Sequence, residues 1–311
     1  MNFRDSPEFR RIARAFPWNQ NGRGVGDDAA WVGDRGLFCC DAMAEDVHFR
    51  WEWSSPRDVG WKCVVANVAD IVCTGGRPLH AVWSVGMGEQ WTDRHFQELS
   101  EGALEACAVS GVDLVGGDTV RCRGKGFVSL ALWGELVEDR PWLRSGARIG
   151  DRLVLIGPLG WSAAGLAALE SGLAEENSFA PLVALHRRPL SPAVAMEAGF
   201  RRCVHAGIDL SDGLSSECEH LANASGVRVV LDSSALVAEP LQIALGQRLG
   251  RDPVNWLLHG GEDHSLLLSV DAHAILPPGV APIGAIEAGS GVWLRQEGEI
   301  RALTSRAWEH V

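Results

Sequence analysis

The chain of 311 residues has no tyrosine, no Cys-x-x-Cys pair and no long apolar run. A membrane-spanning helix needs roughly 20 consecutive apolar residues, so we expect no membrane partner. The eight cysteines show neither zinc spacing nor a disulfide framework. We therefore expect reduced thiols and a cytoplasmic protein. The N-terminal segment Met1-Asn2-Phe3-Arg4-Asp5 also lacks the apolar core of a secretion signal.

Positive charge is scarce, with 28 basic against 40 acidic residues and a net charge of −12. This balance argues against a protein that binds nucleic acid or anionic membrane over a broad surface. An anionic substrate remains compatible, because bound Mg²⁺ can invert the local sign of a site. The length and the 46% hydrophobic content predict a globular protein of two domains.

Several common catalytic motifs are also missing from the sequence. There is no Gly-x-x-x-x-Gly-Lys-Ser/Thr nucleotide loop, no His-Glu-x-x-His zinc helix and no Gly-x-Ser-x-Gly nucleophile elbow. A kinase with this sequence would have to bind its nucleotide by a route other than the P-loop.

What the chain does contain is a set of acidic residues, most of them beside glycine, serine or threonine. They are Gly26-Asp27-Asp28, Asp41, Gly116-Gly117-Asp118-Thr119, Asp209-Leu210-Ser211-Asp212-Gly213 and Gly260-Gly261-Glu262-Asp263. Carboxylates brought together repel each other unless divalent cations lie between them. The pattern predicts a site for hard metal ions with a phosphorylated ligand.

One acid lies inside a long predicted helix. Ser55 as N-cap, Asp58 three residues after it, Pro56 at the first helical position and a glycine pair at 75–76 predict a helix over residues 56–74. Asp70 is surrounded there by valine, alanine and isoleucine, so it must be paired or bound to metal. Asn67, Asp70 and Thr74 share its face. The alternative to metal is an ion pair with Lys62 or Arg77.

Two further segments combine acids with backbone donors. Gly116-Gly117-Asp118-Thr119 follows an apolar strand predicted at 112–116, where glycines let backbone N–H groups approach an anion. The alternative is a tight turn. Asp209-Leu210-Ser211-Asp212-Gly213 precedes an amphipathic helix, so carboxylates and donors converge at a positive helix end. Its alternative is an elaborate N-cap.

The acids of Gly260-Gly261-Glu262-Asp263 precede a strand and could receive a cationic or hydroxylated substrate group. His48 is the one histidine that draws attention, although a lone histidine is more often structural. The remaining elements alternate between helix and strand, which predicts a mixed α/β fold. We expect helices at 8–16, 92–109 and 162–171, and strands at 36–43, 80–87, 127–137, 152–157, 227–232 and 265–270.

The ordered set of segments resembles the thiamine-monophosphate kinase family, within the aminoimidazole ribonucleotide synthetase-like superfamily. The resemblance covers nearly the whole chain. It is carried by the helix at 12–16, Gly26-Asp27-Asp28-Ala29-Ala30, Asp41, Val47-His48-Phe49, the helix from Lys62 to Asp70, Gly116-Gly117-Asp118-Thr119, Arg144-Ser145-Gly146-Ala147, Asp209-Leu210-Ser211-Asp212-Gly213-Leu214 and Gly260-Gly261-Glu262-Asp263.

The resemblance implies a phosphotransferase that converts thiamine monophosphate to thiamine diphosphate with ATP and several Mg²⁺ ions. It implies a two-domain α/β fold of the superfamily type. Residues 1–143 would form an N-terminal ATP and Mg²⁺ domain whose mixed sheet makes a homodimer interface. Residues 144–311 would form a C-terminal α/β domain that completes the substrate site.

The resemblance also assigns roles to individual residues. Metal ligands would be Asp28, Asp41, Asp70, Asp118, Asp209 and Asp212, of which Asp70, Asp118 and Asp212 would be catalytic. ATP would contact Gly117, Asp118, Arg144 and Ser211. Thiamine monophosphate would contact His48, Glu262 and Trp308, the last as an aromatic platform.

Some positions depart from the family pattern. Cys39 and Cys40 replace hydroxyl residues, and thiols are poor ligands for Mg²⁺. Asp46 replaces a glycine, and His264 and Ser265 replace an aromatic residue and an acid. Two alternatives stay open: another ATP-dependent enzyme of the superfamily, and a non-catalytic nucleotide-binding relative.

Overall fold

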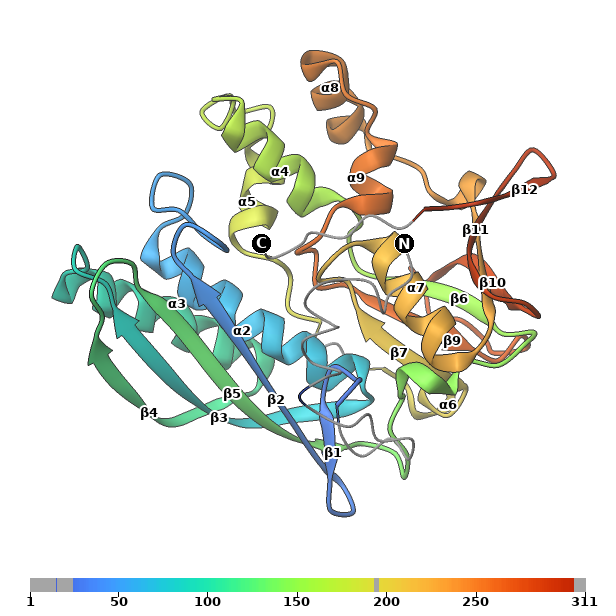
Figure 1. The fold of residues 1–311 in the computed structure, drawn as a ribbon, viewed down its shortest axis with the longest axis horizontal. Coiled ribbons are helices and arrows are strands. Elements are labelled where there is room, and N and C mark those ends of the chain that lie inside the picture. The colour runs from blue at the N-terminus through green and yellow to red at the C-terminus, as the bar shows by residue number, and fades with distance from the viewer. Residues whose placement is uncertain (1–14, 16–24, 193–195, 305–311) are drawn as a thin grey trace.

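The computed structural model describes residues 15, 25–192 and 196–304, which form two sheets with helices packed against them (Figure 1). The helix predicted at 8–16 lies outside the described residues except for Ala15, and so does Trp308. The first sheet has the strand order β1-β2-β5-β3-β4. Its strands are β1 (Ala30–Val32), β2 (Gly36–Ala44), β3 (Gly76–Met87), β4 (Asp113–Arg121) and β5 (Phe127–Leu136).

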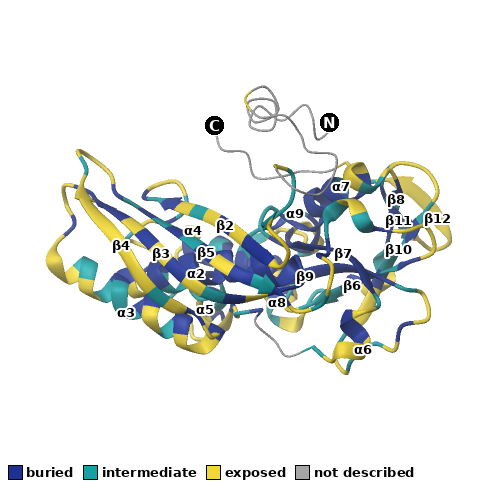
Figure 2. Cartoon of the chain, turned by 90° about the horizontal axis from the view of Figure 1, so that it is seen from below, coloured by how far each residue is buried: buried dark blue, intermediate teal, exposed yellow. Residues whose placement is uncertain are grey.

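The first sheet is mixed, because β3 pairs antiparallel with β5 and parallel with β4. Two helices, α2 (Pro56–Cys73) and α3 (Asp93–Ser110), cover one of its faces. The other face is open, and exposed residues alternate along β2 and β3 and run almost unbroken along β4 (Figure 2). The edge strand β4 is therefore the least covered part of the sheet.

The second sheet has seven strands in the order β12-β11-β8-β10-β6-β9-β7. They are β6 (Arg152–Ile156), β7 (Val204–Asp209), β8 (Arg228–Asp232), β9 (Leu266–Val270), β10 (Ala281–Glu287), β11 (Gly291–Gln296) and β12 (Glu299–Ala302). The helices of this half are α4 (Trp161–Glu170), α5 (Ala180–Arg187), α6 (Ala198–Arg201), α7 (Leu214–Ser225), α8 (Pro240–Leu249) and α9 (Val254–His259). The boundary expected at 143/144 falls in the connection between the two sheets.

Helix α2 lies between the two sheets and is buried on almost every side. Of its 18 residues, only Arg57, Asp58 and Trp61 are not buried. Its apolar side chains share one core with residues of β7 and β9 from the second sheet. A helix that is apolar all round needs this kind of enclosure. Its start is fixed as expected, by a capping box between Ser55 and Asp58.

Most expected elements are present, including the strands that begin near 36, 127, 152, 228 and 266, and the strand expected from 80 begins earlier, at Gly76. One expectation was wrong. Gly116-Gly117-Asp118-Thr119 does not follow a strand but lies inside β4, which continues to Arg121. The glycine is needed there because a Cβ on Gly117 would lie 2.4 Å from the backbone oxygen of Trp83 on β3.

All eight cysteines are free thiols. Within the described part of the chain, none of the helices has the length and apolarity that crossing a membrane requires.

Helices α2 and α3 cross closely at two glycines, Gly60 and Gly102. A Cβ on Gly102 would lie 1.8 Å from the carbonyl oxygen of Arg57, a backbone atom that cannot rotate away. We therefore expect Gly102→Ala to lower the free energy of unfolding by about 1–3 kcal/mol, despite the better helix propensity of alanine. Denaturant unfolding followed by circular dichroism measures the change.

The matched control is Gly199→Ala in α6, where a Cβ would meet no atom within 4 Å. We expect that variant to unfold like the unaltered protein. Equal stability of the two variants would contradict the close crossing of α2 and α3.

Candidate functional site

A cavity of about 1050 Å³ lies between the two halves of the chain. One wall comes from β2, the loop that follows it and α2. The opposite wall comes from α4, the loop after β7 and the segment 259–264. The described residues from the sequence prediction that line it are Asp28, Asp41, His48, Asp70, Arg144, Asp209, Ser211, Asp212 and Glu262.

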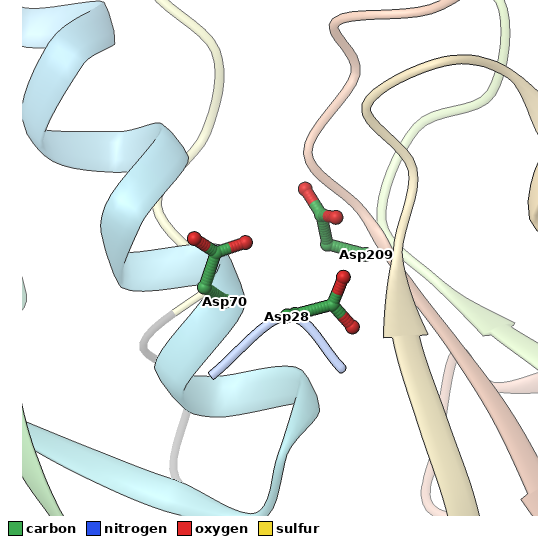
Figure 3. Close-up of side chains that lie close together, drawn as sticks. All are labelled: Asp28, Asp70 and Asp209. Atoms are coloured by element: carbon green, nitrogen blue, oxygen red, sulfur yellow. The ribbon is translucent and has the colours of Figure 1, made fainter. Parts of the chain in front are cut away.

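Three of the carboxylates that line this cavity lie close together. Asp70 projects from α2, Asp209 ends β7, and Asp28 lies between them (Figure 3). Each offers an oxygen, and these oxygens lie within 4.8 Å of one another. The approach of β7 to α2 depends on Gly207, whose Cβ would lie 2.0 Å from the carbonyl oxygen of Cys73. Packing between the halves thus brings the acids together.

The cluster disfavours its own ionisation. Burial, followed by repulsion from Asp41, Asp209 and Asp28, raises the pKa of Asp70 well above its usual range. Burial also raises the pKa of Asp28 to about 6, although Arg144 opposes the shift. The pKa of Asp41 is raised by burial and then by Asp209. Carboxylates in this state accept a cation readily.

The described side chains compensate the acids only partly. Arg144 donates to Asp28, and His264 Nδ1 lies 3.2 Å from Asp209 Oδ2. Burial lowers the pKa of His264, but its contact with Asp209 outweighs this and raises it. Asp70 forms no ion pair with any described residue. The two partners considered for it are engaged elsewhere, Lys62 with Glu262 and Arg77 with Glu135.

The two acids of the segment 260–263 have different surroundings. Asp263 accepts from the backbone N–H groups of Gly160 and Ser162, so it caps the start of α4. Glu262 instead lines the cavity. Burial raises its pKa, but Lys62 and then His186 outweigh this and lower it to about 2. Glu262 is therefore an ionised acceptor at the cavity wall.

Gly117 and Asp118 do not line the cavity. Both lie exposed on the edge strand β4, and Asp118 Oδ1 accepts from the backbone N–H of Thr119. Their roles toward ATP and metal stay predictions. The predicted role of Trp308 falls on a residue outside the described part of the chain.

The structure also shows where the residues that depart from the family pattern lie. Strand alternation turns Cys39 toward α2, where its Sγ lies 3.3 Å from the carbonyl oxygen of Asn67, and leaves Cys40 exposed. Neither cysteine lines the cavity. Asp46 does line it, with a φ of 68° that favours glycine, and forms an ion pair with Lys125.

Sequence reasoning did not single out Glu217. It lies buried in the first turn of α7, and its Oε1 accepts from the backbone N–H of Asp212 at 3.0 Å. Burial, with Asp212 next, raises its pKa well above the usual range. An acid in the first turn of a helix is a common sequence feature. Only its burial in the structure distinguishes Glu217 from other acids of this kind.

Comparisons with family models and with individual proteins point to the same family. Residues 26–136 match the family model of the AIR synthase related protein N-terminal domain, and residues 148–267 match that of the C-terminal domain. A thiamine-monophosphate kinase of Mycobacterium tuberculosis is 40% identical over 248 residues, covering 78% of this chain and 73% of that protein. One from Aquifex aeolicus is 31% identical over 293 residues, covering 92% of each.

A solved structure described as AaThiL complexed with AMPPCP and TMP superposes with a TM-score of 0.87. It is 28% identical, and the match covers 100% of this chain and 99% of that one.

The raised pKa values lead to a prediction about divalent cations. In the folded protein without metal, Asp28, Asp41 and Asp70 retain protons above pH 3.8, where the unfolded chain has released them. Their contribution to stability therefore falls as pH rises toward and past about 6, because the folded state binds more protons. A cation that replaces these protons should stabilise most at higher pH.

We expect Mg²⁺ to raise the melting temperature by roughly 3 °C or more at pH about 7.5, and by less than half of that at pH about 5.5. Thermal unfolding with and without Mg²⁺ measures both shifts. The variant Asp70→Asn should show little response at either pH. A response of equal size at both pH values would speak against a cation among these carboxylates.

Proposed function

The chain belongs to the thiamine-monophosphate kinase family of AIR synthase related proteins, and on that premise we propose that it transfers the γ-phosphate of ATP to thiamine monophosphate. The product is thiamine diphosphate. The observation that carries the proposal is the meeting of Asp28, Asp70 and Asp209 in the cavity between the two halves. The solved structure described as AaThiL complexed with AMPPCP and TMP supports both substrates.

The donor chemistry of the cluster fits Mg²⁺. All three oxygens are carboxylate oxygens, which are the hard ligands that Mg²⁺ prefers. Asp28, Asp70 and Asp209 would hold such ions, with Asp41 on the β2 wall of the cavity and Asp212 on the opposite wall. Bound Mg²⁺ would neutralise the negative charge of the substrate phosphates.

The nucleotide phosphates would lie near Arg144 and Ser211, which both line the cavity. Arg144 is held by Asp28, and its Nε is buried with no hydrogen-bond partner among the described residues. A buried donor of this kind needs an acceptor. Ser211 lies three residues before α7, so its loop also offers the positive end of a helix.

Thiamine monophosphate would occupy the part of the cavity beside His48 and Glu262. Its phosphate is already an anion, so attack in line on the γ-phosphorus needs positioning and no general base. No covalent enzyme intermediate is required. The residues of this chain act by holding two phosphorylated molecules together against their mutual repulsion.

Two other functions remain candidates: another ATP-dependent reaction of the superfamily, and nucleotide binding without catalysis. ATP consumption measured with and without thiamine monophosphate, at several Mg²⁺ concentrations, separates the three. Consumption that needs thiamine monophosphate supports the proposal. Consumption with a different acceptor, or binding alone, rejects it.

Asp70 tests the role of the carboxylate cluster. We expect Asp70→Asn to lower kcat about 100-fold or more, because a neutral amide cannot replace a carboxylate ligand, while the circular dichroism spectrum is preserved. The matched control is Asp113→Asn on the exposed end of β4, which should keep normal turnover. Normal turnover in Asp70→Asn would reject the metal-cluster mechanism.

We also propose that the protein forms a homodimer through the open face of the first sheet. Large apolar side chains on this sheet are uncovered, with exposed fractions of 42% for Phe38, 45% for Val82, 64% for Val115 and 40% for Trp133. An apolar surface of this kind is unusual for a monomer. The family resemblance implies that a second copy of the chain covers this face.

We therefore expect Val82→Glu to convert a dimer into a monomer, because it places a charge in the middle of this face. Sedimentation equilibrium measures the change in mass. The matched control is Val109→Glu on α3, which is 63% exposed but lies on the helical side of the sheet. A monomeric unaltered protein would reject the proposed interface.

A further inference from the structure

Lys62 is a buried cation whose partner lies in the other half of the chain. It is 3% exposed on α2, and its Nζ donates to Glu262 Oε2 at 2.9 Å across 200 residues of sequence. Burying an ammonium group without a partner costs several kcal/mol, so this pair is a strong constraint. Lys62 itself is not among the residues that line the cavity. It therefore acts on the cavity only through Glu262.

The ion pair engages one oxygen of Glu262 and leaves the other available. His186 Nδ1 also lies beside Oε2, at 3.7 Å, and within 3.0 Å of Ser162 Oγ. Burial, followed by Lys62, lowers the pKa of His186 to about 3, so the histidine is neutral and Lys62 supplies the charge. Oε1 of Glu262 forms no hydrogen bond to any described residue.

The backbone holds Glu262 in an uncommon conformation. Its φ is 62°, in the left-handed region that favours glycine, and its N–H donates to the carbonyl oxygen of Ser211 at 2.7 Å. A Cβ on the preceding Gly261 would lie 2.3 Å from that same oxygen. Residues held in this region cost of order 1–3 kcal/mol and are maintained by their surroundings. The strain fixes the direction in which the Glu262 side chain leaves the loop.

We propose that Lys62 is a positioning residue for substrate recognition: it holds Oε2 of Glu262 so that Oε1 faces the cavity and accepts a hydrogen bond from the amino group on the pyrimidine ring of the substrate. The inference rests on the proposed function, because it concerns recognition of the ring of thiamine monophosphate. The pair joins α2 to the loop of the other half, so it also fixes the ring-binding carboxylate relative to Asp70.

Steady-state kinetics of four variants tests this inference: Lys62→Met, Lys62→Arg, Glu262→Gln and the double variant Lys62→Met/Glu262→Gln. We expect Lys62→Met to raise KM for thiamine monophosphate about tenfold or more, the size of one charged hydrogen bond, with kcat within about threefold. KM for ATP should not change. Lys62→Arg should restore part of the affinity, because it keeps the charge.

The double variant distinguishes positioning from a general structural role. If Lys62 acts through Glu262, the double variant should be no worse than Glu262→Gln alone. A matched control is Arg188→Met, which removes another cation that pairs with α2, at Asp58, away from the cavity. It should leave KM for thiamine monophosphate unchanged.

The outcomes separate the two proposals. An unaltered protein that does not phosphorylate thiamine monophosphate overturns the proposed function and this inference together. If the unaltered protein is active, a normal KM in Lys62→Met overturns the inference alone. Additive losses in the double variant, or an equal loss in Arg188→Met, also overturn it.

Discussion

The enclosure of α2 between the two sheets is the constraint on which the rest of the structure depends. A helix enclosed on almost every side can bury polar side chains only where each meets a partner or a ligand. Lys62 meets Glu262, and Asn67 donates to the carbonyl oxygen of Cys63. Asp70 has no cation beside it in the described chain. Asp70, the acid of α2 that no described cation compensates, therefore lies at the junction of the two halves.

That junction explains why the acids gather despite their repulsion. Asp209 reaches Asp70 because β7 packs on the last turn of α2 through Gly207, and apolar contacts along α2 hold this approach. Burial of the shared core outweighs the repulsion among a few carboxylates, which protonation relieves when no cation is present. Because packing assembles the site, the site remains in place when one carboxylate is neutralised. A variant can therefore lose one charge of the cluster and still keep its fold.

The sequence predicted the parts of the site whose signals are local. The capping box of α2, the acid Asp70 inside an apolar helix and the acids before α7 all follow from neighbouring residues. Contacts across the chain could not be predicted in this way. Nothing near Lys62 indicates a partner 200 residues later. The glycines at 116–117 also indicated a turn in the sequence. In the structure they lie in β4, where Gly117 makes room for Trp83 on the neighbouring strand.

The position of two charges on one helix links recognition to chemistry. Lys62 and Asp70 are eight residues apart on α2, which corresponds to about 12 Å along a helix axis. Asp70 belongs to the carboxylate cluster, and Lys62 holds Glu262. A buried helix keeps that separation constant, so under the proposed function the phosphate of the substrate and the amino group on its ring would have to lie at a matching distance. Selection by length would follow from the same packing that assembles the acids.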